Sequence, residues 1–186
     1  TRSSLVTGVQ TCALPISDLI NKFNEGIINM HGGPLPNYRG SFCNIKAVLN
    51  KEKKFGATLH YIDEGIDTGD IIDVQCFDIE ANDTGYSVFL KTLAAGFELF
   101  KKNLPNIING TNKRVPQEEL VSDQFSGMYY TKKSDLETYK KVDLCMSEDE
   151  ILNRIKAFHF PGKESVYLTV GDEKIYLILD KEPIIE

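Results

Sequence analysis

The sequence predicts an α/β fold, because short apolar runs typical of strands alternate with stretches of helical periodicity along the chain. The segment from Gly26 to Met30 is a short apolar run bounded by a glycine and a turn, as expected of a buried parallel strand. Near the C-terminus, a helical pattern and a hairpin pattern follow each other, which predicts a small α+β region. With 186 residues, the chain is long enough to bury a sizeable core.

Further elements are expected between residues 41 and 105. A helix is predicted over Ser41 to Asn50, where a capping residue precedes apolar positions at helical spacing. Strands are predicted over Ala57 to Ile62 and over Ile71 to Ile79, where strand-forming residues alternate with polar ones. A long helix is expected to begin after Asn82-Asp83-Thr84 and to end at Pro105. Its apolar positions form a stripe of Val88, Leu93, Phe97, Phe100 and Leu104.

The C-terminal third contains one polar stretch and two further patterns. The polar stretch, from Gly110 to about Lys133, predicts a linker or an extended arm. A second helix is expected over Ser147 to Phe158, with Ser147 opening a capping box. Strands are expected over Ser165 to Val170 and over Lys174 to Leu179, and the turn residues between them predict a hairpin.

The composition argues against several classes of function. The formal net charge is −6 and basic residues form no cluster, which disfavours a nucleic-acid partner, because Lys and Arg supply the affinity for phosphates. No apolar run approaches the length of a bilayer span, so the sequence does not support a membrane role. Cys43, Cys76 and Cys145 lack metal-ligand spacing and predict reduced thiols in a cytoplasmic protein.

The first residues differ in origin from the rest. Val6 to Ile16 match the translation of a common sequencing-library adapter, so residues 1–16 are expected to be an artefact and are excluded from the fold reasoning. The only charged residue among them is Arg2, and removing its positive charge changes the net charge from −6 to −7. The natural chain is then expected to start at about Ser17 or Asp18.

One pair of segments suggests chemistry. Asn29-Met30-His31 is followed by a turn rich in glycine and proline, Gly32 to Gly40, and then by the acidic segment Asp63 to Asp70. The two segments set an amide, an imidazole and the carboxylate of Asp67 at the ends of predicted strands. This combination suits acyl transfer to an amine.

Each group has a role in such a reaction. An amide that donates to the acyl oxygen stabilises the developing charge by a few kcal/mol, which suits Asn29. The imidazole of His31 can donate to the same oxygen or exchange protons. The carboxylate of Asp67 can orient the imidazole and accept the proton of the amine. This scheme requires no metal.

Taken singly, these residues have structural explanations. Asn29 can bond local backbone, and Asp67 is by default a turn former. Their joint occurrence favours function. His60, in the middle of a predicted strand, is expected to be a packed or hydrogen-bonded structural residue, and His159 is expected to be structural or interfacial.

Together the two segments resemble the signature of the 10-formyltetrahydrofolate-dependent formyltransferases. In that family an Asn-x-His-x-x-x-x-Pro-x-x-x-Gly turn is followed by an Asp-Glu-Gly-x-Asp-Thr-Gly loop, and both patterns occur here. The resemblance implies that Asn29, His31 and Asp67 are catalytic and that 10-formyltetrahydrofolate is the formyl donor. It places four loop residues against the pterin ring of this cofactor: Asp63, Glu64, Gly65 and Ile66.

The resemblance also implies an organisation. Family members carry a preceding half of the fold, so this chain is expected to contain an incomplete doubly wound (Rossmann-like) formyltransferase core and, as a fragment, to be inactive. Residues 17–110 are expected to be the C-terminal half of the catalytic domain, residues 111–133 a linker or arm, and residues 134–186 a small helix–hairpin region. Gly32-Gly33 replaces the Pro-Ser of many members, so the turn on the substrate side is expected to differ.

The tail favours one class of acceptor. From about Leu120 it is short and not basic. Its segments Tyr129 to Ser134 and Ile155 to Gly162, and its hairpin, look most like those of the sugar N-formyltransferases. The expected acceptor is therefore a nucleotide-linked amino sugar, and a homodimer through the C-terminal region is expected. A methionyl-tRNA formyltransferase, which appends a larger basic domain, and a formyltetrahydrofolate hydrolase stay open as alternatives. The tail counts against a glycinamide formyltransferase, and the intact trio counts against a non-catalytic binding module.

Overall fold

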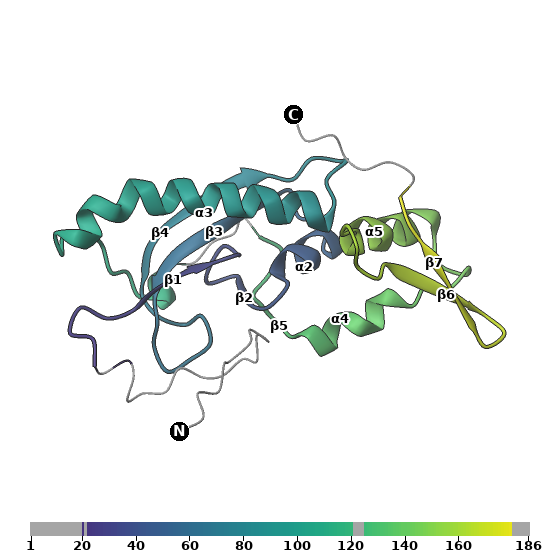
Figure 1. Ribbon diagram of the computed structural model, residues 1–186, viewed down its shortest axis with the longest axis horizontal. Coiled ribbons are helices and arrows are strands. Elements are labelled where there is room, and N and C mark those ends of the chain that lie inside the picture. The colour runs from purple at the N-terminus through teal and green to yellow at the C-terminus, as the bar shows by residue number, and fades with distance from the viewer. Residues whose placement is uncertain (1–19, 21, 121–124, 180–186) are drawn as a thin grey trace, which may run out of the picture.

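A three-stranded sheet forms the centre of the protein in the computed structural model, which describes residues 20, 22–120 and 125–179. Its strands are β1 (Ile28–His31), β3 (Lys54–Tyr61) and β4 (Ile71–Asp78), in the order β1-β3-β4. The long helix α3 (Gly85–Ile108) runs along this sheet (Figure 1). The mixed architecture confirms the α/β fold class. The expected adapter artefact, residues 1–16, lies outside the described residues.

The strand directions correct one expectation. Gly26 to Met30 was expected to be a buried parallel strand, but β1 pairs antiparallel with β3, which in turn pairs antiparallel with β4. Parallel neighbours need a crossover of a dozen or more residues, so the short loop of residues 62–70 accounts for the antiparallel pairing of β3 with β4. Residues 32–53, between β1 and β3, are long enough for a crossover, so loop length does not set the direction of β1. A short apolar run predicts a strand but not its direction.

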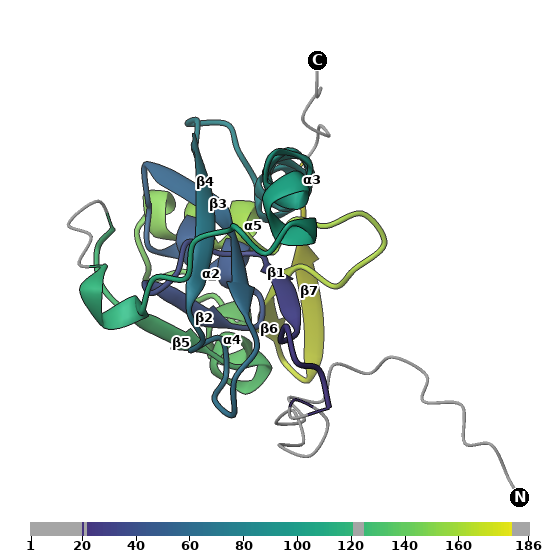
Figure 2. The same cartoon turned by 90° about the vertical axis from the view of Figure 1, so that its left-hand side faces the viewer.

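Two short segments lie beside the sheet. β2 (Tyr38–Gly40) pairs in parallel with β5 (Tyr129–Thr131), and α2 (Cys43–Leu49) follows β2 closely. The expected helix over Ser41 to Asn50 corresponds to α2. Both views place α3 on one side of the sheet and the β2–β5 pair on the other (Figures 1 and 2).

The C-terminal elements gather at one end of the molecule (Figure 1). After a short 3-10 helix, Gln117–Glu119, come α4 (Lys133–Lys140), α5 (Glu148–Phe158), β6 (Val166–Val170) and β7 (Glu173–Leu177). The expected second helix and hairpin are confirmed, and the Ser147 hydroxyl caps α5 by accepting from the Glu150 amide at 3.2 Å. α4 and β5 have no counterpart among the expected elements. The domain boundaries given above stay a prediction.

Helix α3 differs from its expected form in its end and in its buried face. Thr84 caps it as expected, but the helix continues through Pro105 to Ile108. Proline has no N–H to donate to the carbonyl oxygen of Lys101, four residues earlier. Because Lys101 is exposed, water can donate to that oxygen instead, and the helix can continue. Of the expected stripe, Val88 is buried whereas Leu93, Phe97 and Phe100 are exposed.

Small residues explain the buried face of α3. A Cβ atom on Gly96 would lie only 2.4 Å from the Met30 sulfur, so the glycine lets α3 approach β1 closely.

Among the described residues, no helix combines the length and the apolar character needed to cross a membrane.

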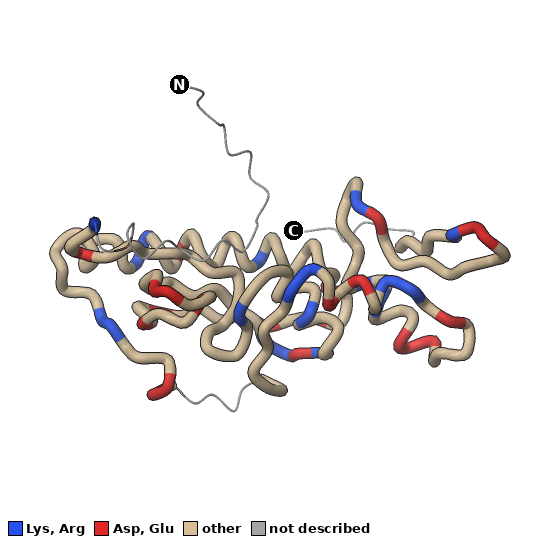
Figure 3. The backbone as a smooth tube through the Cα atoms, turned by 90° about the horizontal axis from the view of Figure 1, so that it is seen from below, with Lys and Arg blue, Asp and Glu red and all other residues tan. Residues whose placement is uncertain are grey.

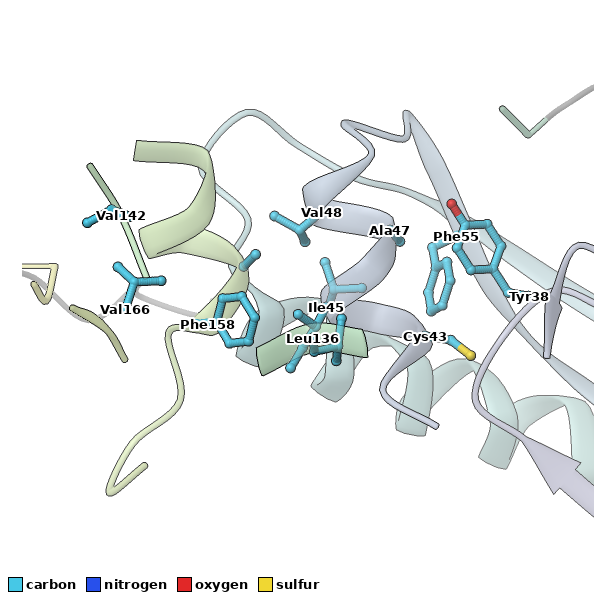
Figure 4. Packing of buried hydrophobic residues seen from close by; sticks show 12 residues of the cluster. Tyr38, Cys43, Ile45, Ala47, Val48, Phe55, Leu136, Val142, Phe158 and Val166 are labelled. Atoms are coloured by element: carbon cyan, nitrogen blue, oxygen red, sulfur yellow. The ribbon is translucent and has the colours of Figure 1, made fainter. Parts of the chain in front are cut away.

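Two clusters of buried apolar side chains hold these elements together. The larger core joins α2 to α4, α5 and β6 and reaches β3 (Figure 4). It includes Tyr38, Ile45, Val48, Phe55, Leu136, Phe158 and Val166. The smaller core lies between the sheet and α3 and contains Leu59, Tyr61, Ile72 and Leu99.

Candidate active site

A cavity of about 590 Å³ opens where β1 ends. Its walls come from β1, the start of α2, the loop of residues 62–70 and the first turns of α3. Asn29, His31 and Asp67 all line it. The structure therefore brings the three residues expected to be catalytic to one place.

Strand pairing positions the amide of Asn29. In the β1–β3 register Asn29 lies directly opposite His60, and directly opposed side chains in an antiparallel pair share one face. The Asn29 side-chain nitrogen Nδ2 lies 3.2 Å from Nε2 of His60. An amide NH₂ has two hydrogens, so one remains for a group in the cavity.

The protonation of His60 fixes the orientation of that amide. Nδ1 of His60 lies 2.7 Å from the carbonyl oxygen of Tyr61, which can only accept, so Nδ1 carries the ring hydrogen. Burial, together with the nearby His31, lowers the pKa of His60. The ring is therefore neutral, Nε2 is an acceptor, and the NH₂ of Asn29 must face it. For the same reason the 3.7 Å approach of Nε2 to an oxygen of Asp67 is not an ion pair.

His31 is held by its other neighbours. Its Nε2 donates to the carbonyl oxygen of Tyr38 at 2.6 Å, so in the neutral ring Nδ1 keeps a free lone pair. That Nδ1 lies 3.5 Å from Oδ2 of Asp67. Gly33 leaves room for this arrangement, since a Cβ there would lie 2.9 Å from both His31 Nε2 and the Tyr38 carbonyl oxygen.

The carboxylate of Asp67 is held from β2. Its Oδ2 accepts from the backbone N–H of Gly40 at 2.9 Å. Asp67 has a φ of 53°, in the left-handed region, which is strained for a residue with a Cβ and persists where surrounding bonds support it. Those bonds come in part from Gln117, whose side-chain nitrogen donates to the carbonyl oxygens of Asp67 and Gly69.

The four residues expected to contact the pterin lie in the same loop. Asp63, Gly65 and Ile66 line the cavity, whereas Glu64 is exposed and does not line it. The Asp63 carboxylate shapes the loop by accepting from the Gly65 amide at 3.0 Å and from the Thr68 hydroxyl at 2.6 Å. These bonds leave Asp63 a structural role in the loop as well as a place in the wall.

A thiol lies behind the imidazole. Cys43 Sγ is 4.0 Å from Nε2 of His31. Burial, with a contribution from the Asp67 charge, raises the pKa of Cys43 to about 12. The thiol is therefore protonated at neutral pH.

Three aromatic side chains contribute to the rest of the wall. Phe42 and Phe89 line it together with Phe160, which follows α5 and packs against Phe89 with the ring centroids 6.3 Å apart. The C-terminal region thus contributes to the cavity. Across the described residues, no group of three or more His, Cys, Asp or Glu side chains is placed to hold a metal ion.

Sequence reasoning placed the trio but gave its supporting groups no role in the site. His60 was expected to be structural, and it is indeed buried and hydrogen-bonded, but its bond to Asn29 also makes it part of the site. Thr58 and His60 form a polar alternation in an otherwise apolar strand, which is a usable signal. Gln117 and Phe160 lie far along the chain and carry no such signal.

Comparison with known proteins places this geometry in context. The sequence model of the formyl transferase family matches residues 12–104. A methionyl-tRNA formyltransferase of Staphylococcus epidermidis (strain ATCC 12228 / FDA PCI 1200) is 34% identical over 152 residues, which cover 82% of this chain and 46% of the relative. The chain spans about a third to a half of the length of such curated relatives.

Solved structures resemble the fold closely. A 4-N formyltransferase from Francisella tularensis superposes with a TM-score of 0.78 at 27% identity, covering 91% of this chain and 67% of that one. An N-formyltransferase from Helicobacter canadensis, solved with folinic acid and dTDP-3-aminofucose, gives a TM-score of 0.67 at 37% identity. That superposition covers 80% of this chain and 52% of the other.

Proposed function

Since this chain belongs to the formyl transferase family, we propose that it acts in the transfer of a formyl group from 10-formyltetrahydrofolate to a primary amine. The observation that carries the proposal is the convergence of Asn29, His31 and Asp67 on one cavity. An amide donor, a ring nitrogen with a free lone pair and a carboxylate are the groups that acyl transfer to an amine needs.

The side chains divide the work. The free hydrogen of the Asn29 amide donates to the acyl oxygen as that oxygen gains negative charge. Nδ1 of His31 accepts the proton that the attacking amine loses, and the protonated ring then faces the Asp67 carboxylate, 3.5 Å away. The ring passes this proton to the folate nitrogen as the bond from that nitrogen to the formyl carbon breaks and tetrahydrofolate leaves. His60 holds the amide of Asn29 in the donating orientation.

The cavity suits a folate donor in its chemistry. Ile62 and Ile66 offer apolar contact, while Asp63 and the backbone of the loop offer acceptors and donors to a pterin ring. The donor supplies the formyl group. We propose Asp63, Glu64, Gly65 and Ile66 as its binding residues, although Glu64 reaches it only if the exposed side chain turns inward.

We propose a nucleotide-linked amino sugar as the acceptor. The Helicobacter canadensis enzyme was solved with such a compound, and it is 37% identical to this chain where the two superpose. Lysines and arginines of the described residues are spread along the backbone in short groups, with acidic residues between many of them, and no long basic stretch stands out (Figure 3). A transfer RNA would need a more basic surface.

Methionyl-tRNA is the second candidate acceptor, because curated relatives at 34–40% identity are methionyl-tRNA formyltransferases. A cytoplasmic location and a homodimer through the C-terminal region accompany the main proposal. Exposed apolar side chains on the hairpin, including Val170, Ile175 and Tyr176, support the dimer, which sedimentation analysis would test.

One experiment separates the acceptors. The full-length protein is incubated with 10-formyltetrahydrofolate and either dTDP- or UDP-linked amino sugars, methionyl-tRNA, or no amine, and the products are identified by mass spectrometry. Formamide formation on a sugar nucleotide, absent in Asp67→Asn, is expected. Formylation of methionyl-tRNA alone would replace the acceptor proposal, and formate release without an amine would indicate the hydrolase.

A further inference from the structure

The loop that carries Asp67 needs support from outside itself. Residues 62–70 contain a non-glycine residue at φ 53°, and the bonds of Asp63 fix only the segment up to Thr68. The carbonyl oxygens of Asp67 and Gly69 bond instead to Gln117. The loop conformation thus depends on a residue that follows α3 by several positions.

Gln117 uses the full capacity of its side-chain amide. Nε2 donates to Asp67 O at 2.9 Å and to Gly69 O at 2.8 Å, while Oε1 accepts from Nε and Nη2 of Arg39 at 3.2 and 2.7 Å. Carbonyl oxygens only accept and guanidinium only donates, so the orientation of the amide is determined. Gln117 is only 4% exposed, so water cannot replace these bonds without rearrangement.

The position of Gln117 follows from its neighbours. Val115 forms a two-bond antiparallel bridge with Ile71, the first residue of β4. This bridge brings the chain after α3 back to the base of the loop. Arg39, on β2, then meets Gln117 from the other side.

Gln117 therefore links the same two segments that the catalytic carboxylate links. Asp67 Oδ2 bonds to the Gly40 amide on β2, and the Arg39–Gln117 pair joins the neighbouring β2 residue to the backbone of Asp67. From this we infer that Gln117 is a positioning residue that sets the place of the Asp67 carboxylate relative to His31. Gln117 does not line the cavity, so it acts through Asp67 and not on substrate.

The structural test needs no catalytic activity. Gln117→Glu keeps the shape and the acceptors for Arg39 but removes both donors to the loop. Amide hydrogen exchange by NMR is expected to show the Gly40 N–H exchanging about tenfold faster, the effect of losing a buried hydrogen bond of typical strength. The Ser41 N–H, bonded to Thr131 O at 2.8 Å, should be unchanged. Equal acceleration of both amides, or of neither, would overturn the inference.

Two further variants serve as controls. Gln75→Glu makes the same change of charge at an exposed glutamine of β4, and Gly40 protection should be unaffected. Arg39→Met leaves the two donors of Gln117 in place, so it is expected to affect Gly40 less than Gln117→Glu does. A larger effect of Arg39→Met would mean that Arg39, and not Gln117, holds the loop.

The catalytic part of the inference rests on the proposed function. In the full-length enzyme, Gln117→Glu is expected to lower kcat about ten- to a hundredfold, as small misplacements of catalytic groups do, with the KM for the amine unchanged. In an Asp67→Asn background, Gln117→Glu should lower kcat little further, because both substitutions act through the same carboxylate. Additive losses would overturn the inference. A full-length wild-type enzyme that formylates no amine would refute the proposed function alone, and the exchange result would still decide the role of Gln117.

Discussion

The larger and the smaller core differ in how completely they are covered. The larger core is enclosed by α2, α4, α5 and the hairpin, and its buried side chains come from segments far apart in the sequence. The smaller core has four buried members, three from the sheet and one from α3, and Met30 and the outward stripe of α3 beside it are exposed. The cavity lies between the two, with the start of α2 on one side and β1 with the loop of residues 62–70 on the other. Stability is thus expected to rest on the larger core, and chemistry on the groups at the boundary.

The largest effect on turnover is expected from the two proposed catalytic residues that line the cavity, His31 and Asp67. In the full-length enzyme, His31→Ala or Asp67→Asn should lower turnover by about 100- to 10,000-fold, the usual contribution of a general acid or base, with little change in thermal unfolding. Steady-state kinetics and calorimetry on the same preparations measure both effects. Near-normal turnover in both variants would remove these residues from the mechanism.

Substitutions in the two cores should separate them by stability. Phe55 is fully buried and packs edge-to-face on Tyr38 with the ring centroids 5.4 Å apart, so Phe55→Ala should cost about 3–5 kcal/mol of unfolding free energy. Leu99→Ala in the smaller core should cost about 2–3 kcal/mol, because the thinner packing there can relax into the space. Urea unfolding measures the two losses. If Leu99→Ala cost more, the ranking of the cores would be wrong.

A pH effect is expected from His60, which lies at the edge of the smaller core. Burial lowers its pKa in the folded protein, so below the ordinary imidazole value of about 6.5 the unfolded chain binds the proton first. Stability should therefore fall as the pH drops through that range, and His60→Gln should flatten the dependence. Unfolding curves between pH 7.5 and about pH 5 would show the difference. Identical slopes in the two proteins would mean that His60 does not contribute.

The smallest effect is expected on the outward stripe. Phe97 is 61% exposed, so Phe97→Gln should change the unfolding free energy by less than about 0.5 kcal/mol while raising solubility. Thermal unfolding and light scattering test the two statements. A large loss of stability would show that another segment or a second copy covers this stripe in solution.

The local patterns predicted much of this molecule, and the long-range contacts explain the rest. The Asn-x-His and Asp-Thr-Gly segments identified the trio because motif spacing is local, and the Ser147 cap and the Gly171 turn were visible for the same reason. The direction of β1 was not predictable, because pairing depends on segments distant in the sequence.

The buried face of α3 was also not predictable from local patterns. A count of apolar residues favoured the stripe through Leu93 and Phe97, yet the helix packs through Gly96 and Thr92, where small side chains permit close approach. Hydrophobic periodicity predicts which face is apolar. It does not predict which face meets the sheet when both are partly apolar.

A thiol next to an imidazole is also the pairing that cysteine hydrolases use to form covalent acyl-enzymes. In this cavity Cys43 keeps its proton, because burial raises its pKa to about 12, and the nearest ring nitrogen already donates to a backbone carbonyl. A protonated thiol is a poor nucleophile. An acyl group brought to this site therefore meets no competing sulfur and has only the incoming acceptor to move to.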